Sequence, residues 1–98
     1  MSDFNYQQLD EIIHSRIRLA IMAVLVSVEE AEFTFLKNKV NTTDSNLSTH
    51  LTKLEDSVYV AVSKSFENKK PVSRYMLTQK GKKAFEIYVE CLEKLIKK

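Results

Sequence analysis

Apolar residues recur at helical spacing in the segment that follows Leu9-Asp10-Glu11, and Ser15 stands where an N-cap is expected. This pattern predicts a helix over about residues 15–28. Arg18 is almost the only polar residue between Ile17 and Val26, so the helix is apolar on every side. A helix of this kind must be covered all round. In a chain of 98 residues we expect the protein's own core to cover one side and a second subunit to cover the other.

Two further helices are predicted after an acidic break at residues 29–32. Thr34 is a suitable cap for a short helix over about 34–40, whose apolar residues Phe35, Leu36 and Val40 are expected to face inward. Asn41 suits a left-handed C-cap at its end. Thr43 is a suitable cap for the next helix, over about 43–57. The apolar positions of that helix form one narrow stripe, made by Leu47, Leu51 and Leu54. We therefore expect this helix to pack against the core along one edge and to be exposed to solvent on its other sides.

The pattern changes after Ser57 to two β-branched and aromatic runs separated by a short polar loop. This predicts a β-hairpin over about residues 59–77, with its tip near 68–70. Thr78 can cap a last helix over about 79–97, whose apolar residues again recur at helical spacing. At about 28 Å, that helix is longer than the rest of the core can cover, so its outer part is predicted to pack on a partner.

Length and composition favour one compact, mainly helical domain. A chain of 11.4 kDa is near the low end for a single core, and one Gly and one Pro leave little for tight turns. The longest apolar run, Leu19 to Val26, is far shorter than the roughly 20 residues that cross a bilayer. The N-terminus lacks an export signal, and the lone Cys91 cannot form an internal disulfide. We expect a cytoplasmic protein with no membrane partner.

The net charge of +2 hides an uneven distribution along the chain. Residues 1–60 hold five basic and nine acidic residues, whereas residues 61–83 hold seven basic residues against Glu67 alone. Positive charge confined to one short stretch is typical of a surface that meets an anionic partner. A lysine-rich hairpin that serves only solubility is the alternative, and charge alone does not decide between the two.

The order of the predicted elements is that of a helix-turn-helix followed by a wing. The segments LDEIIHSRIRLAIM, FTFLKNKV, TDSNLSTHLTKLEDS, YVAVSKSF and RYMLTQKGKKAF resemble the winged-helix transcriptional regulators of the MarR/ArsR type. The resemblance covers nearly the whole chain and is closest to regulators of roughly a hundred residues. Its most specific parts are NLSTHLTKLE and YMLTQKGKKAF. It implies a homodimer that binds double-stranded DNA, with the third main helix in the major groove and the hairpin on the flanking backbone or minor groove.

The residues of the third helix support that reading independently. With the three leucines turned inward, the residues left outside are short hydrogen-bonding side chains and one cation. The predicted DNA-binding residues of this helix are Ser45, Asn46, Ser48, Thr49, His50 and Lys53. Asn46 can pair bidentately with adenine, and Lys53 can reach phosphate or guanine. An ordinary exposed helix face would hold more Glu and Lys.

The hairpin carries the second predicted DNA-binding set, made of cations that can straddle the DNA backbone. Its members are Lys64, Lys69, Lys70 and Arg74. Lys80, Lys82 and Lys83 lie in the first turn of the last helix, where the helix dipole disfavours positive charge. An anionic partner is one explanation for them, and solubility is the other.

Two positions depart from the pattern of the family. Arg16 stands where related proteins usually have proline, and Val58 stands where they usually have glycine. A β-branched residue is costly in a left-handed helix cap, so we expect the end of the third helix to be looser or differently angled. Gly81, the only glycine, matches the family's LTxKG motif, and close packing of a helix on a strand is its predicted role.

Catalytic and metal chemistry are not indicated. His14, His50 and Cys91 lack the spacing of metal ligands on one helix face. The chain has no phosphate-binding loop, no GxSxG or HExxH motif, and no matched nucleophile and base. We therefore predict no enzyme, no metal and no cofactor. His14 is interpreted as a buried hydrogen-bonding residue at the helix start, and Cys91 as a small apolar filler.

The sequence thus predicts a homodimeric winged-helix regulator that dimerises through its first and last helices. The predicted interface residues are Leu19, Met22, Val26, Tyr88, Cys91, Leu92 and Leu95. The alternative is a winged-helix module that binds protein and not DNA. A ligand-responsive repressor, with a small-molecule effector between the first and last helices, is a third possibility that no polar group in the sequence supports.

Overall fold

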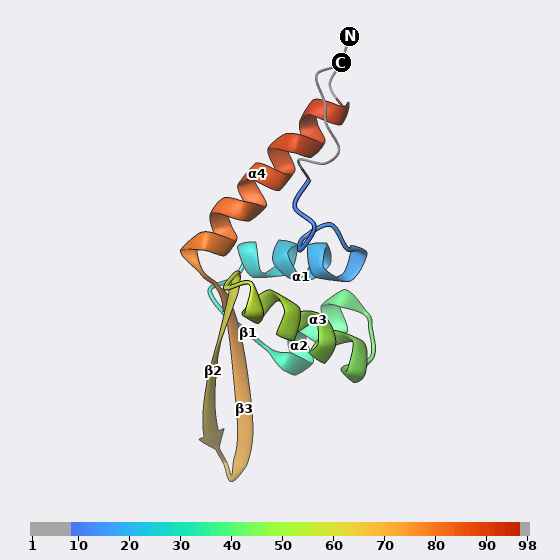
Figure 1. Ribbon diagram of the computed structural model, residues 1–98. Coiled ribbons are helices and arrows are strands. Elements are labelled where there is room, and N and C mark those ends of the chain that lie inside the picture. Colours follow the sequence, from blue (N-terminus) through green and yellow to red (C-terminus); the bar gives the residue numbers. More distant parts are fainter. Residues whose placement is uncertain (1–8, 97–98) are drawn as a thin grey trace.

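The computed structural model describes residues 9–96, which form four helices and a three-stranded antiparallel sheet (Figure 1). The elements in chain order are α1 (Arg16–Val26), β1 (Ala31–Glu32), α2 (Phe33–Val40), α3 (Asp44–Asp56), β2 (Val60–Glu67), β3 (Lys70–Leu77) and α4 (Gln79–Ile96). This is the predicted fold class, a mainly helical winged helix-turn-helix with a small β-hairpin. Residues 1–8 and 97–98, which include the predicted last residue of the final helix, lie outside the described residues.

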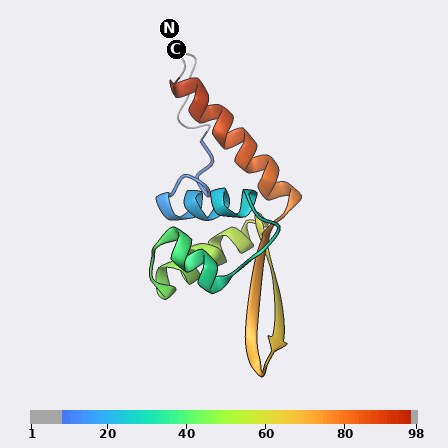
Figure 2. The ribbon, with the colours of Figure 1, turned by 180° about the vertical axis from the view of Figure 1, so that it is seen from behind.

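The molecule is elongated, with extents of 59 × 25 × 21 Å. Helices α1, α2 and α3 form a compact bundle, from which α4 and the β2–β3 hairpin project in opposite directions (Figures 1 and 2). Within residues 9–96, no helix combines the length and the apolar character that a membrane span requires. The two projections leave large surfaces of the chain uncovered.

Helix α1 lies at the centre of the fold and contacts α2, α3, β3 and α4. The Ser15 side chain accepts a hydrogen bond from the Arg18 amide and caps the helix, as predicted. Ile21, Met22 and Leu25 are buried, whereas Val26 is half exposed. The protomer therefore covers one side of this apolar helix and leaves the other side open.

The connection between α1 and α2 differs from the prediction. Residues Ala31 and Glu32 are not a simple acidic break but a two-residue strand, β1, which pairs with β3. Helix α2 begins at Phe33, before the cap predicted at Thr34, and the Glu32 side chain makes no capping hydrogen bond. Tertiary pairing of β1 orders this start in place of a side-chain cap. The predicted left-handed cap is present at Asn41, where φ and ψ are both 60°.

Helix α3 has the cap and the anchoring stripe that the sequence predicts. The Thr43 hydroxyl accepts a hydrogen bond of 3.1 Å from the Asn46 amide. Leu47, Leu51 and Leu54 are at most 1% exposed and belong to the same core cluster as Ile21 and Leu36. Burying three leucines contributes several kcal/mol, at roughly 1.5–3 kcal/mol each, so α3 is held firmly along one edge.

The end of α3 keeps a regular cap although it contains no glycine. Val58 adopts φ 62°, its amide donates to the Glu55 carbonyl, and the Tyr59 amide donates to the Leu54 carbonyl. These are the two hydrogen bonds of a Schellman motif. The expectation of a looser end is therefore wrong: the turn keeps its geometry, and Val58 carries the strain of the left-handed conformation.

Strands β2 and β3 form a regular hairpin, and the sheet order is β1-β3-β2. The register pairs Val60 with Leu77 at the base and Glu67 with Lys70 at the tip. Asn68 and Lys69 form the two-residue turn, with φ values of 52° and 64°. Two left-handed residues are what a type I′ turn requires, and this turn matches the twist of the strands.

Helix α4 begins directly after the hairpin. The Thr78 hydroxyl accepts a hydrogen bond of 2.9 Å from the Gly81 amide, which confirms Thr78 as the cap. A Cβ atom at Gly81 would lie 2.1 Å from the Tyr59 carbonyl oxygen. The predicted role of Gly81, close packing of helix on strand, is confirmed. Toward its C-terminus α4 leaves the bundle, and Leu95 and Ile96 are exposed (Figure 1).

Candidate nucleic-acid interface

The outer face of α3 is open to solvent in the structure. Ser45, Asn46, Ser48, Thr49 and Lys53 are all exposed on it. Their backbone is fixed by the leucine stripe on the opposite face, so these short side chains are presented from a rigid support. Short polar groups on a rigid helix are what close approach to base edges needs.

His50 differs from the other predicted residues of α3, because it is half-buried and has a partner within the fold. Nη1 of Arg18 donates a hydrogen bond of 2.9 Å to Nδ1 of His50, and the Arg18 Nε–H donates to the Ile12 carbonyl. Since arginine has only donors, Nδ1 of His50 is the acceptor, and the neutral ring carries its proton on Nε2. Burial, and secondarily the charge of Arg18, lower the pKa of His50.

Arg18 is therefore a residue that the sequence reasoning missed. It was recognised only as the rare polar residue of an apolar helix, whereas in the structure it ties α1 to α3 through His50. The partner lies 32 residues away, so no local pattern reveals the contact. A charged residue within an otherwise apolar helical segment was the available signal.

A salt bridge lies at the N-terminal end of α3. Nζ of Lys37, on α2, is 2.8 Å from Oδ1 of Asp44 in the first turn of α3. Asp44 lies at the positive end of the helix dipole, as the sequence indicates. Both side chains are well exposed, so the bridge adds little stability. It does, however, neutralise a carboxylate next to the exposed face of α3.

The hairpin divides its predicted cations into two groups. Lys64, Lys69 and Lys70 are exposed on the outer half of the hairpin. Arg74 instead lies nearer the base and is surrounded by carboxylates, at 2.7 Å from Glu67, 3.5 Å from Glu32 and 3.6 Å from Glu30. The hydrogen bond to Glu67 is the main reason that the pKa of Arg74 is raised.

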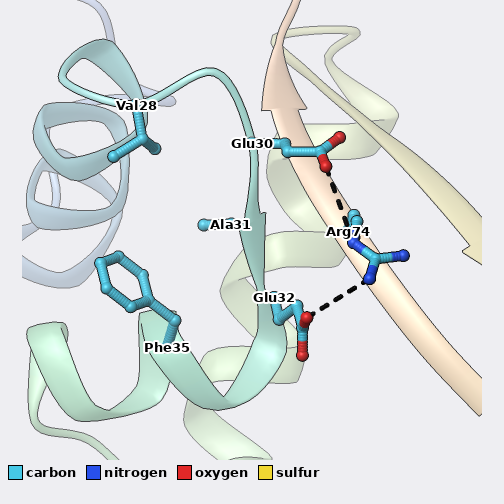
Figure 3. Close-up of a pocket in the computed structure, with 6 residues that line it drawn as sticks. All are labelled: Val28, Glu30, Ala31, Glu32, Phe35 and Arg74. Carbon is cyan, nitrogen blue, oxygen red and sulfur yellow. Dashed lines mark hydrogen bonds and ion pairs between the residues drawn. The ribbon is translucent and has the colours of Figure 1, made fainter.

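The sequence grouped Arg74 with the cations around the tip, but Arg74 lies opposite Ser63 in the middle of the ladder and is ion-paired. The strand β1, which the sequence did not reveal, brings Glu30 and Glu32 against β3 (Figure 3). The three carboxylates more than neutralise the guanidinium. Arg74 is better described as a clamp that ties the hairpin to β1.

The clamp borders an open hollow of about 380 Å³ on the surface of the bundle. Figure 3 shows its lining, which comprises Val28, Glu30, Ala31, Glu32, Phe35 and Arg74. Phe35 was expected to face inward but is 41% exposed here, with Nζ of Lys39 lying 5.6 Å from its ring centre. The hollow presents no nucleophile, and its ionic groups are already paired with one another.

A second hollow, of about 410 Å³, lies between residue 10, the base of the hairpin and α4. The Tyr59 hydroxyl donates to the Asp10 carboxylate there, and Nζ of Lys80 is 5.5 Å from the Tyr59 ring centre. Burial, followed by the interaction with Asp10, raises the pKa of Tyr59 to about 12. Lys80 and Lys83 are exposed beside this hollow, on a different part of the molecule from the outer half of the hairpin.

The predicted dimer residues also separate into two groups. Met22 and Tyr88 are 0% and 3% exposed, so they belong to the core of the protomer and cannot meet a partner. That part of the prediction is wrong, because the bundle itself covers these positions. The Tyr88 hydroxyl also lies 2.7 Å from Nδ1 of His14, which forms a hydrogen bond as expected but is exposed and not buried. The others are at least partly accessible: Leu19, Val26, Cys91, Leu92 and Leu95.

Groups that could hold a metal ion are not found among residues 9–96, since no three His, Cys, Asp or Glu side chains converge there. Cys91 is a free, half-buried thiol on α4. The chemistry of the described surface is therefore that of hydrogen bonding, charge and apolar contact.

Comparison with known proteins agrees with the geometry. Residues 17–96 match the family model of the winged helix DNA-binding domain. An uncharacterized protein of Methanocaldococcus jannaschii is 39% identical over 79 residues, which are 81% of this chain and 86% of that protein. The family match spans the region from α1 into α4.

Solved structures show the same fold. A transcriptional regulator homologue from Pyrococcus horikoshii OT3 superposes with a TM-score of 0.83, at 24% identity, over 89% of this chain and 86% of its own. A MarR family regulator from Silicibacter pomeroyi gives a TM-score of 0.68 at 16% identity, over 92% of this chain and 60% of its own. The fold is thus shared with transcriptional regulators, and neither of these two is described as an enzyme. By its family match, and by an architecture of helix-turn-helix and wing, the chain belongs to the winged helix DNA-binding domains.

Proposed function

We propose that this protein is a sequence-specific regulator of transcription that binds double-stranded DNA as a homodimer. The observation that carries the proposal is the outer face of α3, which is polar and open to solvent, with Lys53 between the aspartates at the two ends of the helix, beside a hairpin with three exposed lysines. We expect such a regulator to act in the cytoplasm.

In this proposal α3 lies in the major groove and reads base edges. Asn46 is in the first turn of α3, the part of a recognition helix that enters the groove, and its amide group matches the N6 and N7 atoms of adenine. Lys53 is a full two turns further along and reaches phosphate or guanine. Ser48 and Thr49 add hydrogen bonds to nearby acceptors. His50, neutral and with Nδ1 occupied by Arg18, offers its Nε2–H as a donor.

The hairpin contributes affinity that does not depend on sequence. Lys64, Lys69 and Lys70 carry no paired carboxylate among the described salt bridges, so they are free to bind phosphates. Each phosphate neutralised adds about 0.9 to the slope of log affinity against log salt. Three lysines in each of two protomers account for a slope of about −5 from the hairpins alone.

The proposed dimer joins the open side of α1 to the outer half of α4. Val26, Leu95 and Ile96 are 51%, 46% and 77% exposed, so apolar surface is available on both elements. Burying it against a second copy provides the driving force for association. A two-fold dimer places two α3 helices about 34 Å apart, which matches successive major grooves on one side of the duplex.

The decisive experiment uses duplexes that the protein itself selects from a random pool. Fluorescence anisotropy at several salt concentrations compares a selected duplex with a random one, and light scattering gives the mass in solution. We expect a dimer, a steep salt dependence, and affinity for the selected duplex at least a hundredfold above that for the random one. A protein that shows no salt-dependent affinity for any duplex would be a protein-binding module instead.

A further inference from the structure

The two faces of the β2–β3 hairpin differ in chemistry. On one face, Phe66 lies opposite Pro71 and Lys64 lies opposite Ser73; we call these four residues the apolar wing face. The other face carries Glu67, its cross-strand partner Lys70 and Arg74, together with Glu32 of β1. Cross-strand partners share a face of a sheet, so the register alone separates the two surfaces.

Phe66 is the most prominent residue of the apolar wing face. Its side chain is 73% exposed, although it belongs to an ordered strand, one residue before the end of β2. Its neighbour across the ladder, Pro71, is also exposed. Phe66 is not among the apolar residues that pack against the core, so its ring contributes little to the stability of the protomer.

Charge determines which kind of partner can approach this ring. Lys64 lies two residues before Phe66 on the same face, and Lys69 and Lys70 follow at the tip. The opposite face has three carboxylates against two cations, Arg74 and Lys70, and is therefore negative by one charge. A polyanion is attracted to the apolar wing face and repelled from the other. An aromatic ring framed by lysines fits a partner that offers both phosphates and stacked rings.

The position of the face agrees with the same partner. Val62 and Tyr75 continue the apolar wing face toward the base, and Tyr75 is buried in the core beside the α3 leucines. Phe66 is thus on the side of the sheet that faces the bundle, about 20 Å along the strand from Val60. A duplex lying against α3 and the outer hairpin would meet the Phe66 ring directly.

We propose that Phe66, supported by Pro71, is an apolar wedge that enters the minor groove of double-stranded DNA and partly unstacks one base step. Apolar wedges of this kind kink the duplex and widen the groove around the inserted residue. The cost of unstacking depends on the step, and it is lowest at TA and CA steps. The hairpin then selects sequence through deformability, beyond the phosphate contacts of its lysines. This inference rests on the proposed function.

The test compares Phe66→Ala and Phe66→Leu with the matched control Phe35→Ala, an exposed phenylalanine on α2 outside the proposed interface. Each variant is titrated by fluorescence anisotropy with a duplex selected by the wild-type protein, at several salt concentrations. End-labelled duplexes report bending by energy transfer. A second duplex replaces the TA or CA step at the hairpin position by a GC-rich step.

We expect Phe66→Ala to weaken binding about tenfold and to abolish the change in energy transfer, with an unchanged salt slope. Phe66→Leu retains most of both effects, because leucine is also an effective wedge. Phe35→Ala behaves like the wild type. The wild-type protein discriminates between the two steps, and Phe66→Ala does not.

Several results would overturn the wedge. Equal affinity and bending for wild type and Phe66→Ala on a bound duplex would remove it while leaving the proposed function intact. Absence of salt-dependent binding by the wild type to any duplex would remove both. Binding of the wild type, but not Phe66→Ala, to phosphatidylglycerol vesicles with no effect on DNA would assign the ring to a membrane surface. A loss of dimer mass in Phe66→Ala would assign it to a second copy of this chain.

Discussion

Helix α3 and the β2–β3 hairpin offer a partner two very different surfaces. The helix is anchored over its whole length by three leucines that are at most 1% exposed, and its open face carries mainly short polar side chains. The hairpin is held only at its base, and its outer half is exposed and rich in lysine. Short side chains can recognise bases only from a fixed backbone, whereas long lysine side chains can reach phosphates without precise placement of the backbone.

The comparison indicates a division of labour between specificity and affinity. On the proposed function, α3 supplies most of the sequence discrimination and the lysines supply most of the salt-dependent attraction. Arg74 belongs to neither function, because its guanidinium anchors the hairpin to β1 and does not extend the cationic surface of the lysines. Five substitutions test this division, beginning with the anchor of α3.

Leu51→Ala removes the central residue of the leucine stripe, which is 1% exposed. We expect the free energy of unfolding to fall by about 2–5 kcal/mol, because the change loses buried apolar surface and leaves a cavity. Urea denaturation followed by circular dichroism measures the loss. Thr52→Ala, on the exposed side of the same turn, is the control, and a similar loss there would contradict the one-sided anchoring of α3.

Asn46→Ala removes a proposed base contact from the exposed face of α3. We expect binding to the selected duplex to weaken by about 1–3 kcal/mol, with a much smaller effect on random duplexes. Anisotropy titrations with both duplexes at one salt concentration give the comparison. The backbone N–H of Asn46, and not its side chain, donates the capping hydrogen bond to the Thr43 hydroxyl, so the substitution leaves the helix cap intact. An equal loss on both duplexes would show that Asn46 does not read sequence.

Val58→Gly relieves the left-handed residue at the end of α3. A non-glycine residue costs about 1–2 kcal/mol at this φ, and the substitution removes that strain. Glycine also increases the conformational entropy of the unfolded chain, which offsets part of the stabilisation. We expect a net stabilisation of about 1 kcal/mol, measured by urea denaturation. DNA affinity should change little, because the Schellman hydrogen bonds are backbone interactions that glycine keeps. A destabilised variant would show that Val58 contributes more than strain.

Lys69→Ala and Arg74→Ala remove one positive charge each from the same hairpin. We expect Lys69→Ala to weaken binding to all duplexes alike and to reduce the salt slope by about 0.9 per protomer. Arg74→Ala should leave the slope nearly unchanged, because its charge is already neutralised by Glu30, Glu32 and Glu67. Anisotropy at four or more salt concentrations measures both slopes. Equal reductions in the two variants would show that Arg74 leaves its carboxylates to bind phosphate.

Local signals predicted the helices well, because each has its own cap or apolar period. Ser15, Thr43 and Thr78 all cap the helices that they were expected to cap, and Asn41 is left-handed as expected. The strand β1 escaped prediction, since two residues show no period and gain their order only by pairing with β3. The hairpin cations were identified as a group, but the partners of Arg74 were not, because Glu32 lies 42 residues away.

The apolar pattern of this chain determined which residues turn inward, where the helices begin and that the broad polar side of α3 remains outside. Those properties depend on neighbours within one or two turns, and a sequence displays them directly. Only the tertiary structure decided that Met22 and Tyr88 are covered by their own protomer, that Arg74 is clamped by three carboxylates and that Phe66 is left bare. Periodicity shows which face of an element a side chain occupies. Which other element contacts that face depends on distances that only the folded chain fixes.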